Sequence, residues 1–135
     1  MRFLLDTNVI SEVGKPRPHP KVLTWLLEHE SACGVPSVAV AELYQGAYGT
    51  AGGRKESPLK DIEAFVAEAS DRIVPFDAGA AAAWGEYVSQ PSLKQKPQSY
   101  PDTQIAAIAI SRKLIVVTRN TGDFPFVETL NPFAE

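Results

Sequence analysis

Residues 2–8 read RFLLDTN, a short apolar run that polar residues close at once. The run at residues 2–5 has the length of a buried strand, and Asp6, Thr7 and Asn8 favour a turn directly after it. Such a strand places Asp6 just beyond its carboxyl end. Because ligands in open parallel sheets bind at this edge, Asp6 is the first candidate for a functional residue.

The rest of the chain alternates short apolar runs with helical patterns. Strands are predicted at residues 33–35, 73–74 and 114–118, with a last edge strand at 127–130. Helices are predicted to begin near Pro20, at Pro36 and Ser37, at Ser57 and Pro58, at Asp77, and at Asp102. Proline and glycine predict loops at residues 16–20 and 90–101 and no continuous strong helix over 46–57. The alternation predicts an α/β fold with right-handed βαβ units and helices on both faces of a parallel sheet.

The composition predicts one domain that spans residues 1–135. The length is usual for a single domain, and the 44% of hydrophobic residues are spread along the chain. The single cysteine, Cys33, rules out an internal disulfide and agrees with a reducing compartment. No segment has the length of a signal peptide's apolar region or of a membrane-spanning helix, so we expect a cytoplasmic protein. The net charge of −3 neither favours nor excludes binding to nucleic acid.

Four acidic residues are predicted to meet at one edge of the sheet. They are Asp6 after the first strand, Glu42 early in its helix, Asp102 at a helix start, and Asp123 after the strand at 114–118. Two unit charges about 4 Å apart repel by ~4 kcal/mol at an effective dielectric constant near 20, whereas a whole domain is stable by roughly 5–15 kcal/mol. Such a cluster needs a cation, and oxygen donors without histidine or cysteine favour Mg²⁺ or Mn²⁺ over zinc.

Each of these residues also has an ordinary structural interpretation. Asp6 and Asp123 are of a type common in turns, Asp102 is of a type common at helix caps, and Glu42 has the character of a solvated helix residue. Taken singly, none of them indicates a metal site. Their joint placement is what favours one.

Four segments in chain order carry a resemblance to a known family. They are LLDTNVISE at residues 4–12, PSVAVAEL at 36–43, DTQIAA at 102–107, and VTRN at 117–120 followed by Asp123 and Phe124. On these segments the chain resembles the PIN-domain family, and in particular the VapC-type toxins of bacterial toxin–antitoxin pairs. The sequence departs from the family pattern at Ser99, Tyr100 and Pro101, which bears on the rim of the site.

The resemblance implies a three-layer α/β/α sandwich with a central parallel sheet of about five strands, and a metal-dependent endoribonuclease activity. The family's acidic positions correspond here to Asp6, Glu42, Asp102 and Asp123, which would be catalytic and hold one or two Mg²⁺ or Mn²⁺ ions. The polar residues that would orient these carboxylates are Thr7, Asn8, Thr118 and Asn120. A bound ion would activate water for hydrolysis of an RNA phosphodiester bond.

RNA contacts and protein partners are further expectations. The candidates for binding RNA phosphates are Arg54, Lys55, Lys94, Lys96 and Arg119, each of which is equally well explained as ordinary surface charge. A VapC-like toxin is expected to form a homodimer and to bind a VapB-like antitoxin. The helices that carry residues 22–27 and 59–66 are apolar enough for a groove that accepts an amphipathic helix, or for core packing.

Two other functions are compatible with parts of the sequence. A PIN-like domain that binds RNA without cleaving it would not need four carboxylates, because an unused acidic cluster is destabilising. A phosphatase with Asp6 as nucleophile, as in haloacid-dehalogenase-like proteins, would need a second aspartate where this sequence has Asn8. A serine–histidine–aspartate set is not expected, because His19 and His29 are predicted to be surface residues.

Overall fold

The structure, a computed structural model, describes residues 1–49 and 56–134, and in this part of the chain it contains a five-stranded parallel sheet. The strands are β1 (Phe3–Leu5), β2 (Cys33–Pro36), β3 (Ile73–Val74), β4 (Ile115–Val117) and β5 (Thr129–Leu130). Their order is β3-β2-β1-β4-β5, and each neighbouring pair is parallel. The first strand is therefore central, so that Asp6 lies in the middle of the sheet's carboxyl edge.

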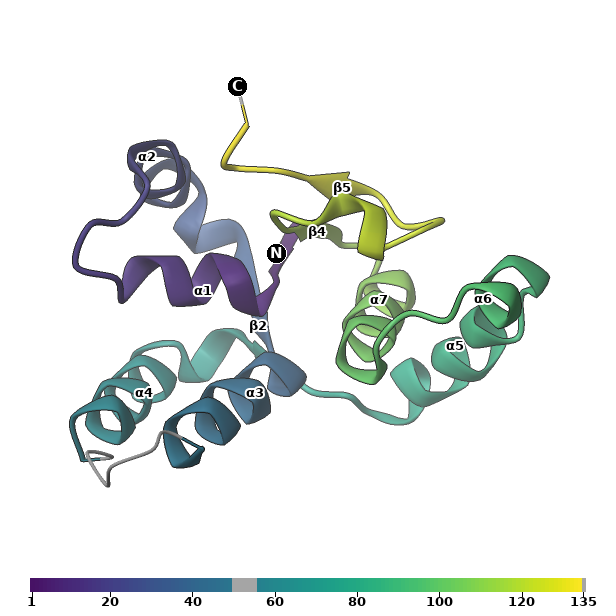
Figure 1. The fold of residues 1–135 in the computed structure, drawn as a ribbon, viewed down its shortest axis with the longest axis horizontal. Helices are drawn as coiled ribbons and strands as arrows, with labels where there is room; N and C mark the ends of the chain where they lie inside the picture. The colour runs from purple at the N-terminus through teal and green to yellow at the C-terminus, as the bar shows by residue number, and fades with distance from the viewer. Residues whose placement is uncertain (50–55, 135) are drawn as a thin grey trace.

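Helices cover both faces of this sheet (Figure 1). They are α1 (Thr7–Val13), α2 (Pro20–His29), α3 (Ser37–Tyr48), α4 (Glu56–Glu68), α5 (Ala78–Val88), α6 (Pro91–Gln95) and α7 (Tyr100–Arg112). In Figure 1, α1, α2 and α4 lie on one side, α5, α6 and α7 lie on the other, and α3 lies between α4 and α7. The predicted α/β/α sandwich is confirmed.

The side chains of the central strands alternate between two hydrophobic cores, as the pleat of a strand requires. Leu4 and Val116 pack in the core beneath α5 and α7. Phe3, Leu5 and Val117 pack in the core beneath α1 and α2. Because both faces are buried, the strands are apolar throughout, which explains the continuous apolar run seen in the sequence.

The residues that follow β1 form a helix, so the prediction of a turn at Asp6, Thr7 and Asn8 is wrong. Asp6 has an extended backbone and caps α1, and its side chain accepts a hydrogen bond from the Thr7 backbone N–H. The side chains that favour a turn are the same ones that favour a helix N-cap. Burial of Val9 and Ile10 against the sheet decides between the two.

Several other predicted boundaries differ from the structure. The strands predicted at residues 114–118 and 127–130 are shorter, at Ile115–Val117 and Thr129–Leu130. The expected loop at residues 90–101 contains α6, whose first residue is Pro91 and whose Leu93 is buried. Helix α7 begins at Tyr100 with Ser99 as its cap, two residues before the predicted start at Asp102, because proline is accepted in a first helical turn. Helix α4 begins at Glu56 rather than at Ser57. Part of the segment predicted to lack a strong helix, residues 50–55, lies outside the described residues.

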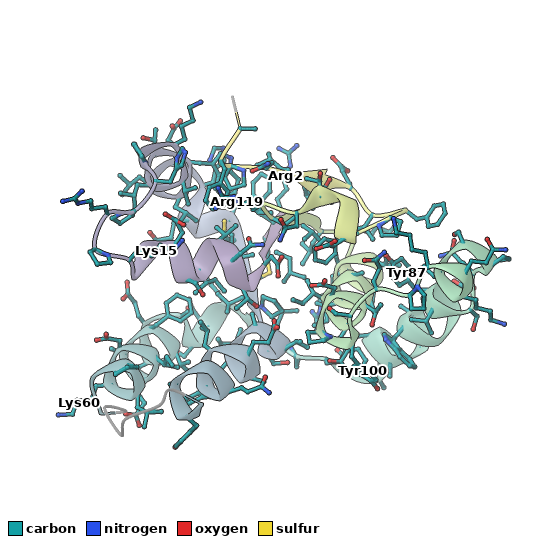
Figure 2. The ribbon with its side chains drawn as sticks, viewed as in Figure 1. Arg2, Lys15, Lys60, Tyr87, Tyr100 and Arg119 are labelled. Atoms are coloured by element: carbon teal, nitrogen blue, oxygen red, sulfur yellow. The ribbon has the colours of Figure 1, made fainter. Side chains whose placement is uncertain are left out.

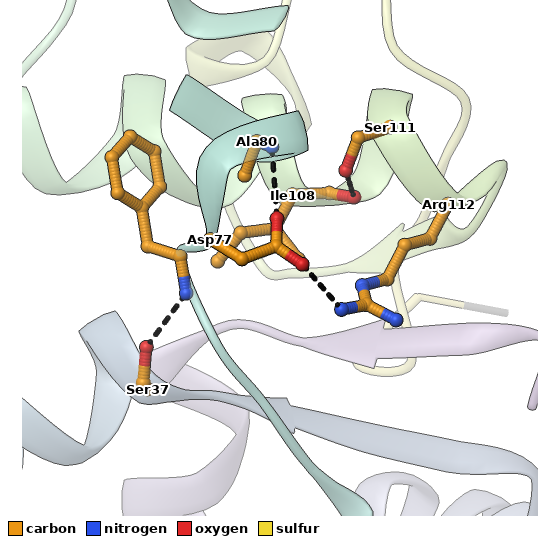
Figure 3. Close-up of polar contacts among 7 residues, drawn as sticks. Ser37, Asp77, Ala80, Ile108, Ser111 and Arg112 are labelled. Carbon is orange, nitrogen blue, oxygen red and sulfur yellow. Dashed lines mark hydrogen bonds and ion pairs between the residues drawn. The ribbon is translucent and has the colours of Figure 1, made fainter. Parts of the chain in front are cut away.

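The predicted start of α5 at Asp77 is confirmed (Figure 3). The Asp77 carboxylate accepts a hydrogen bond from the Ala80 N–H at 3.0 Å and pairs with Arg112 of α7 at 3.0 Å. Just before the cap, the Phe76 N–H donates to the Ser37 hydroxyl of α3 at 3.1 Å. These contacts connect α3, α5 and α7 on the far side of the molecule from α2.

The two histidines are half-buried, so the prediction that both are surface residues is wrong. His19 caps α2 through its ring nitrogen, and the ring of His29 stacks on Trp25 with centroids 4.4 Å apart. Both rings thus have structural contacts. Within the described residues, no helix is long and apolar enough to cross a bilayer.

Candidate active site

The four acidic residues line one pocket at the carboxyl edge of the sheet. Asp6 follows β1 directly, and Asp123 ends the short 3-10 helix η3 (Thr121–Asp123) that comes after β4. Glu42 lies in the second turn of α3, and Asp102 is the third residue of α7. All four border the same pocket of about 430 Å³. Elements far apart in the sequence therefore bring together the residues that sequence analysis selected.

Asp6 is the most constrained of these carboxylates. Asp6 is only 5% exposed, and both of its side-chain oxygens accept hydrogen bonds. The Thr7 backbone N–H donates to Oδ1 at 2.8 Å, and the Thr118 hydroxyl donates to Oδ2 at 2.8 Å. The Asp6 backbone N–H donates to the Val117 carbonyl at 2.9 Å, which extends the pairing of β1 with β4. The carboxylate is held in one orientation from three sides.

Thr118 is the centre of the polar network around Asp6. It is fully buried, and its hydroxyl accepts a hydrogen bond from the Asn120 backbone N–H at 3.0 Å while it donates to Asp6. Asn8 donates from Nδ2 to Asp6 at 3.2 Å and accepts the Arg119 backbone N–H at 3.2 Å. Asn120 thus contributes through its backbone, whereas Thr118 and Asn8 contribute through their side chains.

Glu42 is oriented by a side-chain hydrogen bond, and Asp102 is placed by the helix turn that carries it. The Thr7 hydroxyl donates to Glu42 Oε1 at 2.6 Å. Asp102 lies in the first turn of α7, where the Ser99 hydroxyl accepts its backbone N–H at 3.3 Å. Thr7 therefore links two of the carboxylates, because its backbone binds Asp6 and its hydroxyl binds Glu42.

The carboxylates influence one another's protonation. Burial raises the pKa of Asp6 above its ordinary value, and the charges of Glu42 and Asp123 raise it further, against the lowering effect of the bonds from Thr118 and Thr7. Burial also raises the pKa of Asp102, with smaller contributions from Asp6 and Asp123. The charges of neighbouring carboxylates thus disfavour ionisation of Asp6 and Asp102, which is the electrostatic condition that a bound cation relieves.

The donor set has the chemistry that Mg²⁺ and Mn²⁺ prefer. The pocket offers carboxylate oxygens from the four predicted residues and from Glu12, and no histidine or cysteine. In the described residues, however, no three acidic, histidine or cysteine side chains already stand in an arrangement that would hold a metal ion. The donors fit the ion chemically, and their side chains would have to move closer together to share it.

Comparisons with known proteins identify the family of this chain. The family model for the PIN domain matches residues 3–128. The chain belongs to the PIN domain family. It is 36% identical to toxin FitB of Neisseria gonorrhoeae over 126 residues, with 90% of each chain covered. It is 30% identical to VapC ribonuclease Y4jK of Sinorhizobium fredii over 136 residues, with 97% of each chain covered.

A solved structure gives the same result for the fold. The crystal structure of FitAcB from Neisseria gonorrhoeae matches with a TM-score of 0.86 at 33% identity, and covers 98% of this chain and 99% of that one. The family resemblance carried by the four sequence segments is confirmed.

The basic residues predicted to bind RNA do not all lie at the pocket of this PIN domain. Arg119 lines the pocket beside the carboxylates. Lys94 and Lys96 are exposed at the end of α6, and neither borders the pocket. Figure 1 shows α6 on the side away from α1, so the structure does not bring these two lysines to the site. Arg54 and Lys55 lie outside the described residues.

Sequence analysis missed several residues that line the pocket. Ser11, Glu12 and Lys15 border it, and so does Phe133 near the C-terminus. Glu12 is only 5% exposed, which is unusual for a charged residue. A helix directly after Asp6 would have revealed Ser11 and Glu12, which lie on α1, and Lys15 follows just beyond its end. Phe133 has no local signal that would have found it.

Proposed function

We propose that this PIN domain is a Mg²⁺- or Mn²⁺-dependent endoribonuclease and the toxin of a VapBC-like toxin–antitoxin pair in the cytoplasm. The observation that carries the proposal is the meeting of Asp6, Glu42, Asp102 and Asp123 in one pocket, with Asp6 buried and fixed by Thr118. The similarity to a toxin and to a VapC ribonuclease supports the activity and the biological role. One or two ions are compatible with four carboxylates.

In the proposed mechanism, the chain's residues hold the metal and orient the reacting groups. Asp6 and Asp102 are the expected direct ligands, while Glu42 and Asp123 complete the acidic wall. A bound Mg²⁺ or Mn²⁺ ion would supply a water of lowered pKa and neutralise charge on the leaving oxygen. Thr118 fixes the direction of the Asp6 carboxylate, which lines the pocket.

The alternative of an aspartate nucleophile fits the structure poorly. Both oxygens of Asp6 accept hydrogen bonds, and the side chain two residues later is Asn8, which donates to Asp6 instead of acting as an acid. The alternative of a silent RNA-binding domain leaves unexplained why Asp6 and Asp102 are kept partly buried among other carboxylates at a raised pKa.

The antitoxin is proposed to dock in an apolar groove on the side of α1 and α2. This groove of about 440 Å³ is bordered by residues of α1, α2, α3 and α4, among them Ile10, Leu26 and Phe65. Leu27 and Val13 also border it, and they are 81% and 50% exposed. Exposed apolar side chains along a groove between helices suit the apolar face of an amphipathic helix. A homodimer is a further expectation from the family, which sedimentation of the purified protein would test.

RNA cleavage with and without metal tests the proposed activity. Purified protein is incubated with total RNA or with defined tRNA and messenger RNA in Mg²⁺ or Mn²⁺, and in EDTA. Cleavage is expected only with metal. Cleavage that persists in EDTA would rule out the metal mechanism, and absence of both cleavage and Mn²⁺ binding would favour the silent domain.

A matched pair of variants locates the activity. Asp102→Asn is expected to abolish cleavage, because it removes a carboxylate of the pocket. Asp77→Asn makes the same chemical change at the cap of α5, outside the pocket, and is expected to keep full cleavage. Equal loss in both variants would mean that the site is placed wrongly.

A further inference from the structure

The pocket that holds the carboxylates extends along α1 and has a second, basic end. Asp6 caps the start of this helix, and Lys15 follows its last residue by two positions. Both line the pocket, together with Arg119 and Phe133. A helix of this length spans about 10 Å. The pocket therefore offers room for more of a ligand than the single phosphodiester at the carboxylates.

Glu12 does not make this end acidic, because its charge is already paired. Its Oε1 lies 2.9 Å from Lys15 Nζ, and its Oε2 accepts the His19 backbone N–H at 2.8 Å. These contacts lower the pKa of Glu12, to which the charge of Arg119 also contributes. Lys15 and Arg119 together outweigh the one carboxylate, so this end of the pocket carries net positive charge.

Arg119 is held at this end by its backbone and by an aromatic ring. Its N–H donates to Asn8 Oδ1 at 3.2 Å, and its carbonyl accepts from Asn131 Nδ2 at 3.4 Å. The guanidinium carbon lies 4.6 Å from the centre of the Phe133 ring. Figure 2 shows Arg119 and Lys15 on the same side of the molecule, near α1.

Phe133 is itself fixed in place. The edge of the His19 ring contacts it with centroids 5.5 Å apart, and its backbone N–H donates to Asn131 Oδ1 at 2.9 Å. A guanidinium held over an aromatic face by cation–π attraction can still donate its N–H groups to an anion in pairs. Among the described residues, no carboxylate lies within ion-pair distance of Arg119.

We propose that Arg119, assisted by Lys15, binds a backbone phosphate of the RNA strand next to the one cleaved at the carboxylates, and that Phe133 positions Arg119 for this contact. The inference rests on the proposed ribonuclease function and adds a substrate-binding subsite to it. A basic anchor is needed because the carboxylates alone repel RNA. Arginine with a fixed plane suits a phosphate, whose oxygens accept two parallel hydrogen bonds.

Binding of an oligonucleotide tests the subsite apart from cleavage. The probe is a fluorescein-labelled 12-nucleotide oligouridylate, and its anisotropy is followed between 50 and 300 mM KCl. All variants are made in an Asp6→Asn background, which prevents turnover. Arg119→Ala is expected to weaken binding about tenfold and to reduce the slope of log K against log salt by about 0.7. Lys60→Ala removes an exposed lysine of α4 and is expected to change neither.

Two substitutions of Phe133 separate positioning from packing. Phe133→Tyr keeps an aromatic face and is expected to retain binding. Phe133→Leu keeps apolar bulk without a ring and is expected to weaken binding several-fold, with the salt slope unchanged because the arginine charge remains. If both variants bind alike, Phe133 does not position Arg119, and that part of the proposal is wrong.

The outcomes also distinguish this subsite from the proposed activity. In proteins with native Asp6, Arg119→Ala is expected to raise KM and to leave kcat unchanged. If native protein never cleaves RNA but the oligonucleotide binds in an Arg119-dependent way, the subsite stands and the nuclease function fails. If Arg119→Ala binds like Lys60→Ala, or if no protein binds the probe, the subsite is overturned.

Discussion

Replacing Thr118 by valine removes one hydroxyl from the centre of the site and keeps the side chain's shape. Thr118 is fully buried, and its hydroxyl donates to Asp6 Oδ2 at 2.8 Å and accepts the Asn120 N–H at 3.0 Å. Thr118→Val therefore leaves a buried carboxylate with one bond fewer and a backbone donor without its acceptor. A methyl group takes the hydroxyl's place.

The magnitude follows from these contacts. A hydrogen bond to a charged group contributes ~1.5–3 kcal/mol, and the added buried methyl group offsets ~0.8 kcal/mol. With the unsatisfied Asn120 N–H included, we expect the free energy of unfolding to fall by about 2 kcal/mol. Metal affinity should fall by about 10- to 100-fold, because the residue that orients a ligand is lost. Thr118→Ser, which keeps the hydroxyl and loses a methyl group, should cost about 1 kcal/mol of stability and little metal affinity.

Urea unfolding without metal and calorimetry with Mn²⁺ measure the two effects separately. The midpoint of unfolding should shift for both variants with an unchanged slope, whereas Mn²⁺ affinity should fall only for valine. If Thr118→Val binds Mn²⁺ as tightly as the native protein, Thr118 does not orient a metal ligand. If serine loses as much affinity as valine, loss of packing, rather than of the hydrogen bond, is responsible.

Three further substitutions test other parts of the structure. The pKa of Asp6 is raised, so its ionised form lowers the stability of the fold at pH values above that pKa. In EDTA at pH 7, Asp6→Asn should therefore unfold at a urea concentration no lower than that of the native protein. Mg²⁺ should raise the melting temperature of the native protein and not that of the variant. If Asp6→Asn is clearly less stable than the native protein in EDTA, the ionised Asp6 side chain does not lower the stability of the fold. The pKa of Asp77 is lowered chiefly by the Ala80 N–H and also by Arg112, so its ionised form stabilises the fold above pH ~4. The native protein should unfold at a higher urea midpoint than Asp77→Asn, and this difference should shrink as the pH falls below that value. A difference that does not change with pH would refute the stabilising role of the Asp77 charge. Leu27→Asp should weaken pull-down of the co-expressed antitoxin and leave RNA cleavage intact. The control Ile110→Asp changes an exposed residue of α7 outside the groove and should not affect the pull-down. Equal weakening in both variants would mean that the antitoxin does not bind in this groove.

The local sequence was sufficient for most elements of the fold. The apolar run before Asp6 and the one at residues 114–118 predict strands because both faces of a parallel sheet are buried. Asp77 predicts its helix because a side-chain oxygen at a cap binds a backbone N–H of the same turn. These patterns are local because strand burial shows in consecutive residues and a helix cap in residues of one turn, although the strands pair with distant parts of the chain.

The carboxylates were predictable for a related reason. The carboxyl ends of parallel strands lie at one edge of a sheet, so Asp6 after β1 and Asp123 after β4 were expected there before the strand order was known. Asp102 was predicted as a helix start and is the third residue of α7, an error of two positions that leaves it facing the pocket. A small error in a boundary matters little when the whole first turn faces the same edge.

The sequence by itself determined the five strands, the helices other than α1 and α6, and the four acidic positions. Only the tertiary structure decided the rest of the pocket. Asp6 satisfies a turn and a helix cap equally well, and packing of Val9 and Ile10 on the sheet chooses the helix that brings Glu12 and Lys15 to the site. The contact of Arg119 with Phe133 joins residues on either side of β5, and no local pattern records it. Such contacts arise because burial and charge act through space, between residues that the chain separates.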